Sequence, residues 1–127
     1  MNTTNIIQFK KSDTKKQIVF GEVYVPDRED TDGNFMNAET IENMAHDFLA
    51  NKYNSHISEE HDGNENKGCI VESFIARNGD PDFIQGAWVI GVYVPDKEVW
   101  NKIESGELAG FSLEGTGYLI EEENTNE

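Results

Sequence analysis

The chain has 127 residues, and its ten Lys and Arg against 25 Asp and Glu give a formal net charge of −15. This length is typical of a single domain, and so acidic a surface repels phosphate, which argues against nucleic-acid binding. The chain is 36% apolar, which is too much for a disordered protein of this charge. No apolar run approaches the roughly 20 residues that cross a bilayer, so we expect neither a membrane anchor nor secretion.

The chain contains one cysteine, Cys69. A single thiol excludes an internal disulfide framework and any zinc site that needs two thiolates, and it is typical of a reducing compartment. The sequence therefore predicts a cytosolic protein.

The first half of the chain predicts a lead-in, a strand and a helix. Four of the ten basic residues lie in segment 10–16, so residues 1–16 are interpreted as a flexible basic lead-in. The alternating residues from Gln17 predict a strand that ends at Pro26, with Gly21 marking a bulge or a bend. After a loop, Asn37 caps a predicted helix with helically spaced apolar residues. These are Ile41, Met44, Ala45, Phe48 and Leu49.

The second half predicts more strands. Segments 68–77 and 82–96 are expected to form an antiparallel hairpin around the turn at 78–81. Asp96 caps a short helix that ends at Gly106, and a last strand runs over 111–120 before an acidic tail at 121–127. This order predicts an α+β fold, in which two helices flank a compact antiparallel or mixed sheet or a small barrel.

Two metal-site hypotheses are disfavoured by the sequence. Residues 28–39 match several positions of a calcium-binding EF-hand loop, but Arg28 stands where the first carboxylate ligand belongs and a strand precedes the loop. His46, His56 and His61 have no zinc-binding register, and His46 lies off the apolar stripe of its helix, as an exposed residue would. We therefore expect no metal and no cofactor.

Two residues are candidates for acyl-transfer chemistry. His61 precedes a predicted strand, where an accessible imidazole can act as a general base. Ser112 lies on the last predicted strand among glycines, although the pattern is not G-x-S-x-G and a strand serine is usually structural. Together they would make a nucleophile and its base, with backbone amides near the glycines available for an oxyanion.

The sequence resembles the XkdF-type phage serine proteases, relatives of the prohead maturation proteases whose fold is similar to herpesvirus assemblin. The resemblance covers residues 17–120. It rests on VFGEVYVPD, DTDGNFMNAETIENMAHDFL, His61 followed by GCIVESFI, GAWVIGVYVPDKEVWNKIESGE and GFSLEG, and the last two in succession are the most specific.

This resemblance implies that His61 is the general base and that Ser112 is the nucleophile. The residue that orients the histidine in prohead proteases generally lies well beyond the serine, but this chain ends fifteen residues after Ser112. Glu114 is our choice for this third member, and a Ser–His dyad is an alternative. The other candidates are Glu72, Glu121, Glu122 and Asp62.

The expected function is therefore that of a serine endopeptidase in phage capsid maturation. The domain, at residues 17–120, would cleave scaffold and major capsid proteins by acyl transfer inside the assembling procapsid in the host cytoplasm. It would bind neither nucleic acid nor membrane, and whether it forms a homo-oligomer is left open. The alternative function is that of a non-catalytic structural or interaction module of the same fold in the procapsid.

Overall fold

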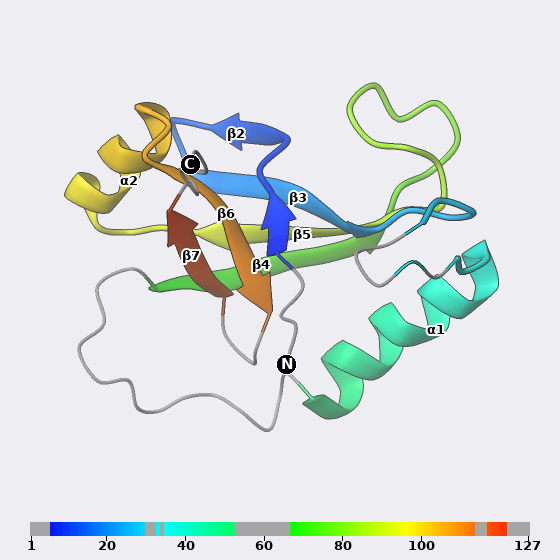
Figure 1. Ribbon diagram of the computed structural model, residues 1–127. Helices are drawn as coiled ribbons and strands as arrows, with labels where there is room; N and C mark the ends of the chain where they lie inside the picture. Colours follow the sequence, from blue (N-terminus) through cyan, green and yellow to red (C-terminus); the bar gives the residue numbers. More distant parts are fainter. Residues whose placement is uncertain (1–5, 30–32, 34, 53–66, 114–116, 122–127) are drawn as a thin grey trace.

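The structure is a computed structural model, and it describes residues 6–29, 33, 35–52, 67–113 and 117–121. Figure 1 shows strands grouped between two helices that lie on opposite sides of them in this view. The strands are β1 (Ile6–Gln8), β2 (Lys11–Asp13), β3 (Ile18–Tyr24), β4 (Lys67–Ile75), β5 (Trp88–Tyr93), β6 (Leu108–Leu113) and β7 (Gly117–Glu121). The helices are α1 (Ala38–Asp47), which continues into a π-helical segment (Phe48–Lys52), and α2 (Lys97–Glu104).

The strands form two antiparallel sheets that share β4. In one sheet β4 pairs with β5, β5 with β3, and β3 with β2. In the other, the first residues of β4 pair with β7, β7 with β6, and β6 with β1. The prediction of an α+β fold with two helices is confirmed.

The small-barrel alternative is wrong, because the strand order β1-β6-β7-β4-β5-β3-β2 stays open at its two ends. Its end strands β1 and β2 follow one another in the chain, and the chain changes sheets between them. The Phe9 amide donates to the Ala109 carbonyl (3.1 Å), and the Lys10 amide donates to the Phe20 carbonyl (2.7 Å). A single crossing of the chain therefore joins the sheets at this corner, where a barrel would need a continuous strand ladder.

Side-chain caps start both helices as the sequence predicts. The Asn37 side chain accepts from the Thr40 amide at 2.9 Å, and the Asp96 side chain accepts from the amides of Glu98 and Val99. Such caps satisfy amides that have no partner within the helix. The α2 helix ends before Gly106, whose φ of +90° suits glycine at this position.

A large apolar cluster holds the helices against the sheets. Helix α1 packs against β4 and β5, and α2 packs against β6. Phe48 lies with its ring centre 5.5 Å from that of Trp88, and Val99, Trp100 and Ile103 of α2 are buried. The burial of these side chains is the main stabilising contribution to the fold.

A second apolar cluster covers another part of the β3–β5–β4 sheet. It contains Phe20, Ala76, Phe83 and Val89. Residues 82–87, expected in the strand of the predicted hairpin, precede β5, which begins at Trp88. Phe83 from this connection packs on Phe20, and the centres of the two rings are 6.1 Å apart. The connection therefore acts as a cover for this cluster.

Three details of the predicted elements are corrected by the structure. Strands β1 and β2 lie within the segment expected to be a flexible lead-in. Strand β1 pairs with β6 and β2 pairs with β3, and Ile7 of β1 is buried in the main cluster. The last predicted strand is two paired strands, β6 and β7. Leu49 is 40% exposed, since the helix changes to π geometry at Phe48 and no longer follows the α-helical spacing.

The boundary of the domain at residue 17 stays a prediction, as does the tail, of which residues 122–127 lie outside the described residues. Among the helices that the structure describes, none is long and apolar enough to span a membrane.

Candidate active site

Ser112 lies in β6, which is paired on both sides. Its partner in β1 is Ile6, and its partner in β7 is Tyr118. The preceding residue, Phe111, is fully buried and packs with its ring centre 6.0 Å from that of Phe9. A buried aromatic anchor next to Ser112 and hydrogen-bonded neighbours on both edges fix the position of the backbone at the serine.

The register extends from Ser112 to the start of β4. Tyr118 pairs with Ser112 on one side and with Lys67 on the other. Neighbouring strands lie about 4.8 Å apart, so the backbone at Lys67 is two spacings, or about 10 Å, from that at Ser112. The three strands can be followed in Figure 1. The segment that ends at Lys67 is the one that contains His61.

His61 and Glu114 lie outside the described residues, as do the alternatives Asp62 and Glu122. The other two alternatives for the third member lie away from the register row of Ser112. Glu72 is exposed on β4 and pairs with Gly91 of β5, and Glu121 of β7 pairs with Leu108. The assignment of Ser112, His61 and Glu114 as catalytic residues therefore stays a prediction.

His46 is exposed, as its place off the apolar stripe predicts, and lies 3.8 Å from the Glu42 carboxylate one turn earlier on α1. Cys69 is an exposed free thiol on β4. In the described part of the chain, no group of three or more His, Cys, Asp or Glu side chains could hold a metal ion.

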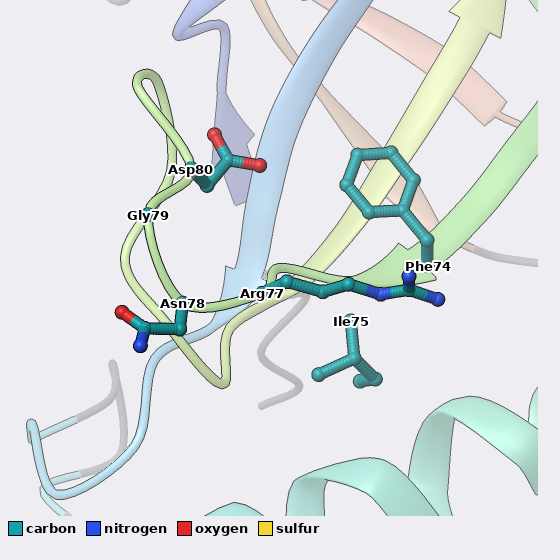
Figure 2. Close-up of a pocket in the computed structure, with 6 residues that line it drawn as sticks. All are labelled: Phe74, Ile75, Arg77, Asn78, Gly79 and Asp80. Carbon is teal, nitrogen blue, oxygen red and sulfur yellow. The ribbon is translucent and has the colours of Figure 1, made fainter.

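A pocket of about 370 Å³ lies at the other end of β4, where it leads into the turn before β5. Figure 2 shows the side chains that line it. They are Phe74, Ile75, Arg77, Asn78, Gly79 and Asp80. The sequence predicted the turn at 78–81, but a pocket beside it could not be foreseen, because the pocket depends on how the turn folds back over the sheet.

Asp80 shapes the turn beside this pocket. Its Oδ1 accepts from the amides of Asp82 (2.8 Å) and Phe83 (2.9 Å). These hydrogen bonds stabilise the charged carboxylate and hold the pKa of Asp80 below its usual value, with smaller contributions from Lys11 and Lys10. The side chain of Asp80 therefore has a structural task within the turn.

Two curated proteins of Bacillus subtilis (strain 168) are similar to this chain. "Phage-like element PBSX protein XkdF" is 39% identical over 120 residues, which are 91% of this chain and 42% of that protein. "Uncharacterized protein YqbD" is 40% identical over 119 residues, which are 90% of this chain and 35% of that protein. The chain thus spans less than half the length of these relatives. No solved structure is significantly similar to it.

The family model described as "Putative phage serine protease XkdF" matches residues 5–121, which include every described strand and both helices. This match extends over nearly the whole chain, and the relative named XkdF supports it independently. The chain therefore belongs to the family described as "Putative phage serine protease XkdF".

Proposed function

We propose that this domain is a serine endopeptidase of phage capsid maturation, which cleaves segments of scaffold and major capsid proteins by acyl transfer. The observation that carries the proposal is the register row from Ser112 through Tyr118 to Lys67. It joins a serine on a firmly anchored strand to the strand that follows His61. The family description and the phage-like element of the PBSX relative support the reaction and its setting.

The length of the chain allows His61 to act on Ser112. Lys67 follows His61 by six positions in the chain, and six extended residues can span up to about 20 Å. This exceeds the separation of about 10 Å between the backbones at Lys67 and Ser112. A base carried by the segment before β4 is therefore within reach of the nucleophile.

The proposed reaction has two acyl-transfer steps. His61 accepts the hydroxyl proton as Ser112 Oγ attacks the scissile carbonyl carbon, and it returns this proton to the leaving amine when the C–N bond breaks. Water then attacks the acyl-enzyme while His61 takes a proton from it, and His61 returns this proton to Ser112 Oγ as the ester bond breaks and the acid product leaves. Glu114 would orient the imidazole, or His61 and Ser112 would work as a dyad.

The proposed substrates and setting are those that the resemblance to prohead proteases implies. We propose that scaffold and major capsid proteins are cleaved inside the assembling procapsid, in the host cytoplasm, with no cofactor.

The test is co-expression with the cognate scaffold and major capsid proteins. Wild type should yield shortened substrate chains, and Ser112→Ala should leave them intact. Ser12→Ala is the matched control, because Ser12 is an exposed serine on β2. A fluorophosphonate probe should label the wild type and the Ser12→Ala variant, but not the Ser112→Ala variant.

Cleavage that persists in the Ser112→Ala variant would show that another residue is the nucleophile. If the wild type neither cleaves nor accepts the probe but co-assembles with capsid protein, the domain is instead a structural module of the procapsid.

A further inference from the structure

The pocket at the turn between β4 and β5 lies far from the proposed nucleophile. Lys67, in the register row of Ser112, and Ile75, in the pocket, are at the two ends of β4. Ile75 follows Lys67 by eight positions along this extended strand, a distance of about 26 Å. A ligand in this pocket would therefore not occupy the place of a scissile bond at Ser112.

Two apolar residues of β4 line the pocket. Phe74 and Ile75 are only partly buried, and Phe74 packs against the second apolar cluster while Ile75 packs against the main one. Phe74 is held in place by Phe83, whose ring centre lies 6.0 Å away in an edge-on arrangement. An aromatic ring that is already fixed loses little conformational entropy when a ligand packs on it.

An arginine also lines this pocket. Figure 2 shows the Arg77 side chain running from the turn toward Phe74 and Ile75, with its charged end away from Asp80 and Asn78. The described residues give Arg77 no ion-pair partner, whereas Lys10 and Lys11 are each 2.9 Å from a carboxylate. Arg77 is also exposed, so a partner in solution can reach it.

The carboxylate in the same pocket does not compete for the guanidinium. Asp80 accepts two amide hydrogen bonds from its own turn, and it lies on the far side of the pocket from the charged end of Arg77. The pocket thus offers a bidentate donor beside an apolar surface. A guanidinium of this kind matches a carboxylate in shape and charge.

We propose that this pocket binds an extended acidic segment of a partner protein, with one Glu or Asp carboxylate on Arg77 and a neighbouring apolar side chain against Phe74. Its volume of about 370 Å³ suits one or two side chains. The net charge of −15 repels acidic partners at long range, so recognition depends on the local ion pair. The pocket thus serves as a docking site separate from the proposed catalytic serine.

The test uses two blocked pentapeptides, one with a central glutamate between leucines and one with glutamine in its place. Calorimetric titration of the wild type should show the glutamate peptide binding at least about tenfold more tightly, which corresponds to about 1.4 kcal/mol. Arg77→Gln should remove this difference. Lys97→Gln, at an exposed cation on α2, is the control and should retain it.

A backbone-amide spectrum locates the binding. The glutamate peptide should shift the resonance of the Gly79 amide, and the Ser112→Ala variant should bind the peptide as the wild type does. Equal affinity for the two peptides, an unchanged preference in Arg77→Gln, or shifts confined to other residues would overturn the proposal. Because binding is measured without cleavage, this result is independent of the proposed protease activity.

Discussion

Ser112 of β6 lies directly opposite Tyr118 of β7, and the next strand in the same row is the beginning of β4. Sheet pairing therefore brings Lys67, which follows His61 by six positions in the chain, close to the strand that carries the serine. A nucleophile and a base separated by 51 positions in the sequence can meet in this way. The first prediction concerns this base.

His61→Ala should lower the rate of substrate cleavage by about 10²- to 10⁴-fold, as expected for the loss of a general base. His46→Ala should leave it unchanged, because His46 is exposed on α1. In the wild type, activity should rise with pH through the pKa of a free imidazole, near 6.5, as the base loses its proton. Cleavage rates of purified variants between pH 5 and 8 check both expectations.

Equal losses in the two histidine variants would contradict the assignment, since they would point to an effect on stability. A flat pH profile in the wild type would also contradict it.

The second prediction concerns the contact of Gly91 with Phe20. A Cβ at Gly91 would lie 2.8 Å from the Phe20 ring and 3.1 Å from the Glu72 Cβ. Gly91→Ala should therefore destabilise the domain by about 1–3 kcal/mol through overpacking. Urea denaturation measures the change in the free energy of unfolding.

Phe20→Leu provides the matched background for this test, because it removes ring atoms that the new methyl group would meet. Gly91→Ala should cost less in that background than in the wild type. Equal costs in the two backgrounds would mean that the ring is not what limits the space at residue 91.

The elements that the sequence predicted well depend on local signals. The caps at Asn37 and Asp96 and the helix end at Gly106 are set by residues within a few positions of one another, and the structure confirms them. The hairpin of β4 and β5 is also confirmed as an antiparallel pair, although β5 is shorter than predicted.

The elements that the sequence missed depend on long-range contacts. Residues 1–16 look like a polar lead-in, but Ile7 is buried and Lys10 pairs with Glu22. The pocket beside Arg77 likewise depends on the packing of Phe83 over the sheet. As for the proposed active site, only the strand position of Ser112 is tested, and the roles of His61 and Glu114 come from the family resemblance alone.

The third prediction concerns the pH dependence that Asp80 confers. Its folded-state pKa is lowered by the amide hydrogen bonds from Asp82 and Phe83. A carboxylate whose pKa is depressed by folding stabilises the native state above its unfolded pKa of about 3.9, and this stabilisation is lost as pH falls through the folded pKa. Asp80→Ala should therefore be less stable than the wild type at pH 7, and the difference should shrink in acid.

Urea denaturation at pH 7 and at about pH 3 measures this difference. Asp80→Asn is the control, because it keeps an acceptor oxygen without the charge, and it should fall between the other two proteins at pH 7. A difference that stays constant over this pH range would show that the charge of Asp80 does not matter.

The fourth prediction is that millimolar calcium leaves the melting temperature unchanged. Arg28 occupies the first ligand position of the EF-hand-like segment 28–39, of which residues 30–32 and 34 lie outside the described residues. A site with an affinity of about 10 μM would stabilise the native state by about 2.7 kcal/mol at 1 mM calcium. An increase of several degrees in thermal unfolding with calcium, abolished by a chelator, would contradict the prediction.

The last prediction is that the domain does not bind DNA. Two of the four basic residues in segment 10–16 are neutralised within the fold, because Lys10 lies 2.9 Å from the Glu22 carboxylate and Lys11 lies 2.9 Å from that of Asp82. Non-specific DNA binding requires cations that neutralise phosphates, and the net charge of −15 opposes it further. An electrophoretic mobility shift assay with duplex DNA should show no complex at physiological salt up to about 100 μM protein, the upper end of ordinary non-specific dissociation constants. A complex that weakens steeply as salt is raised, and that Lys15→Gln with Lys16→Gln abolishes, would show instead that the remaining lysines of this segment form a DNA-binding site.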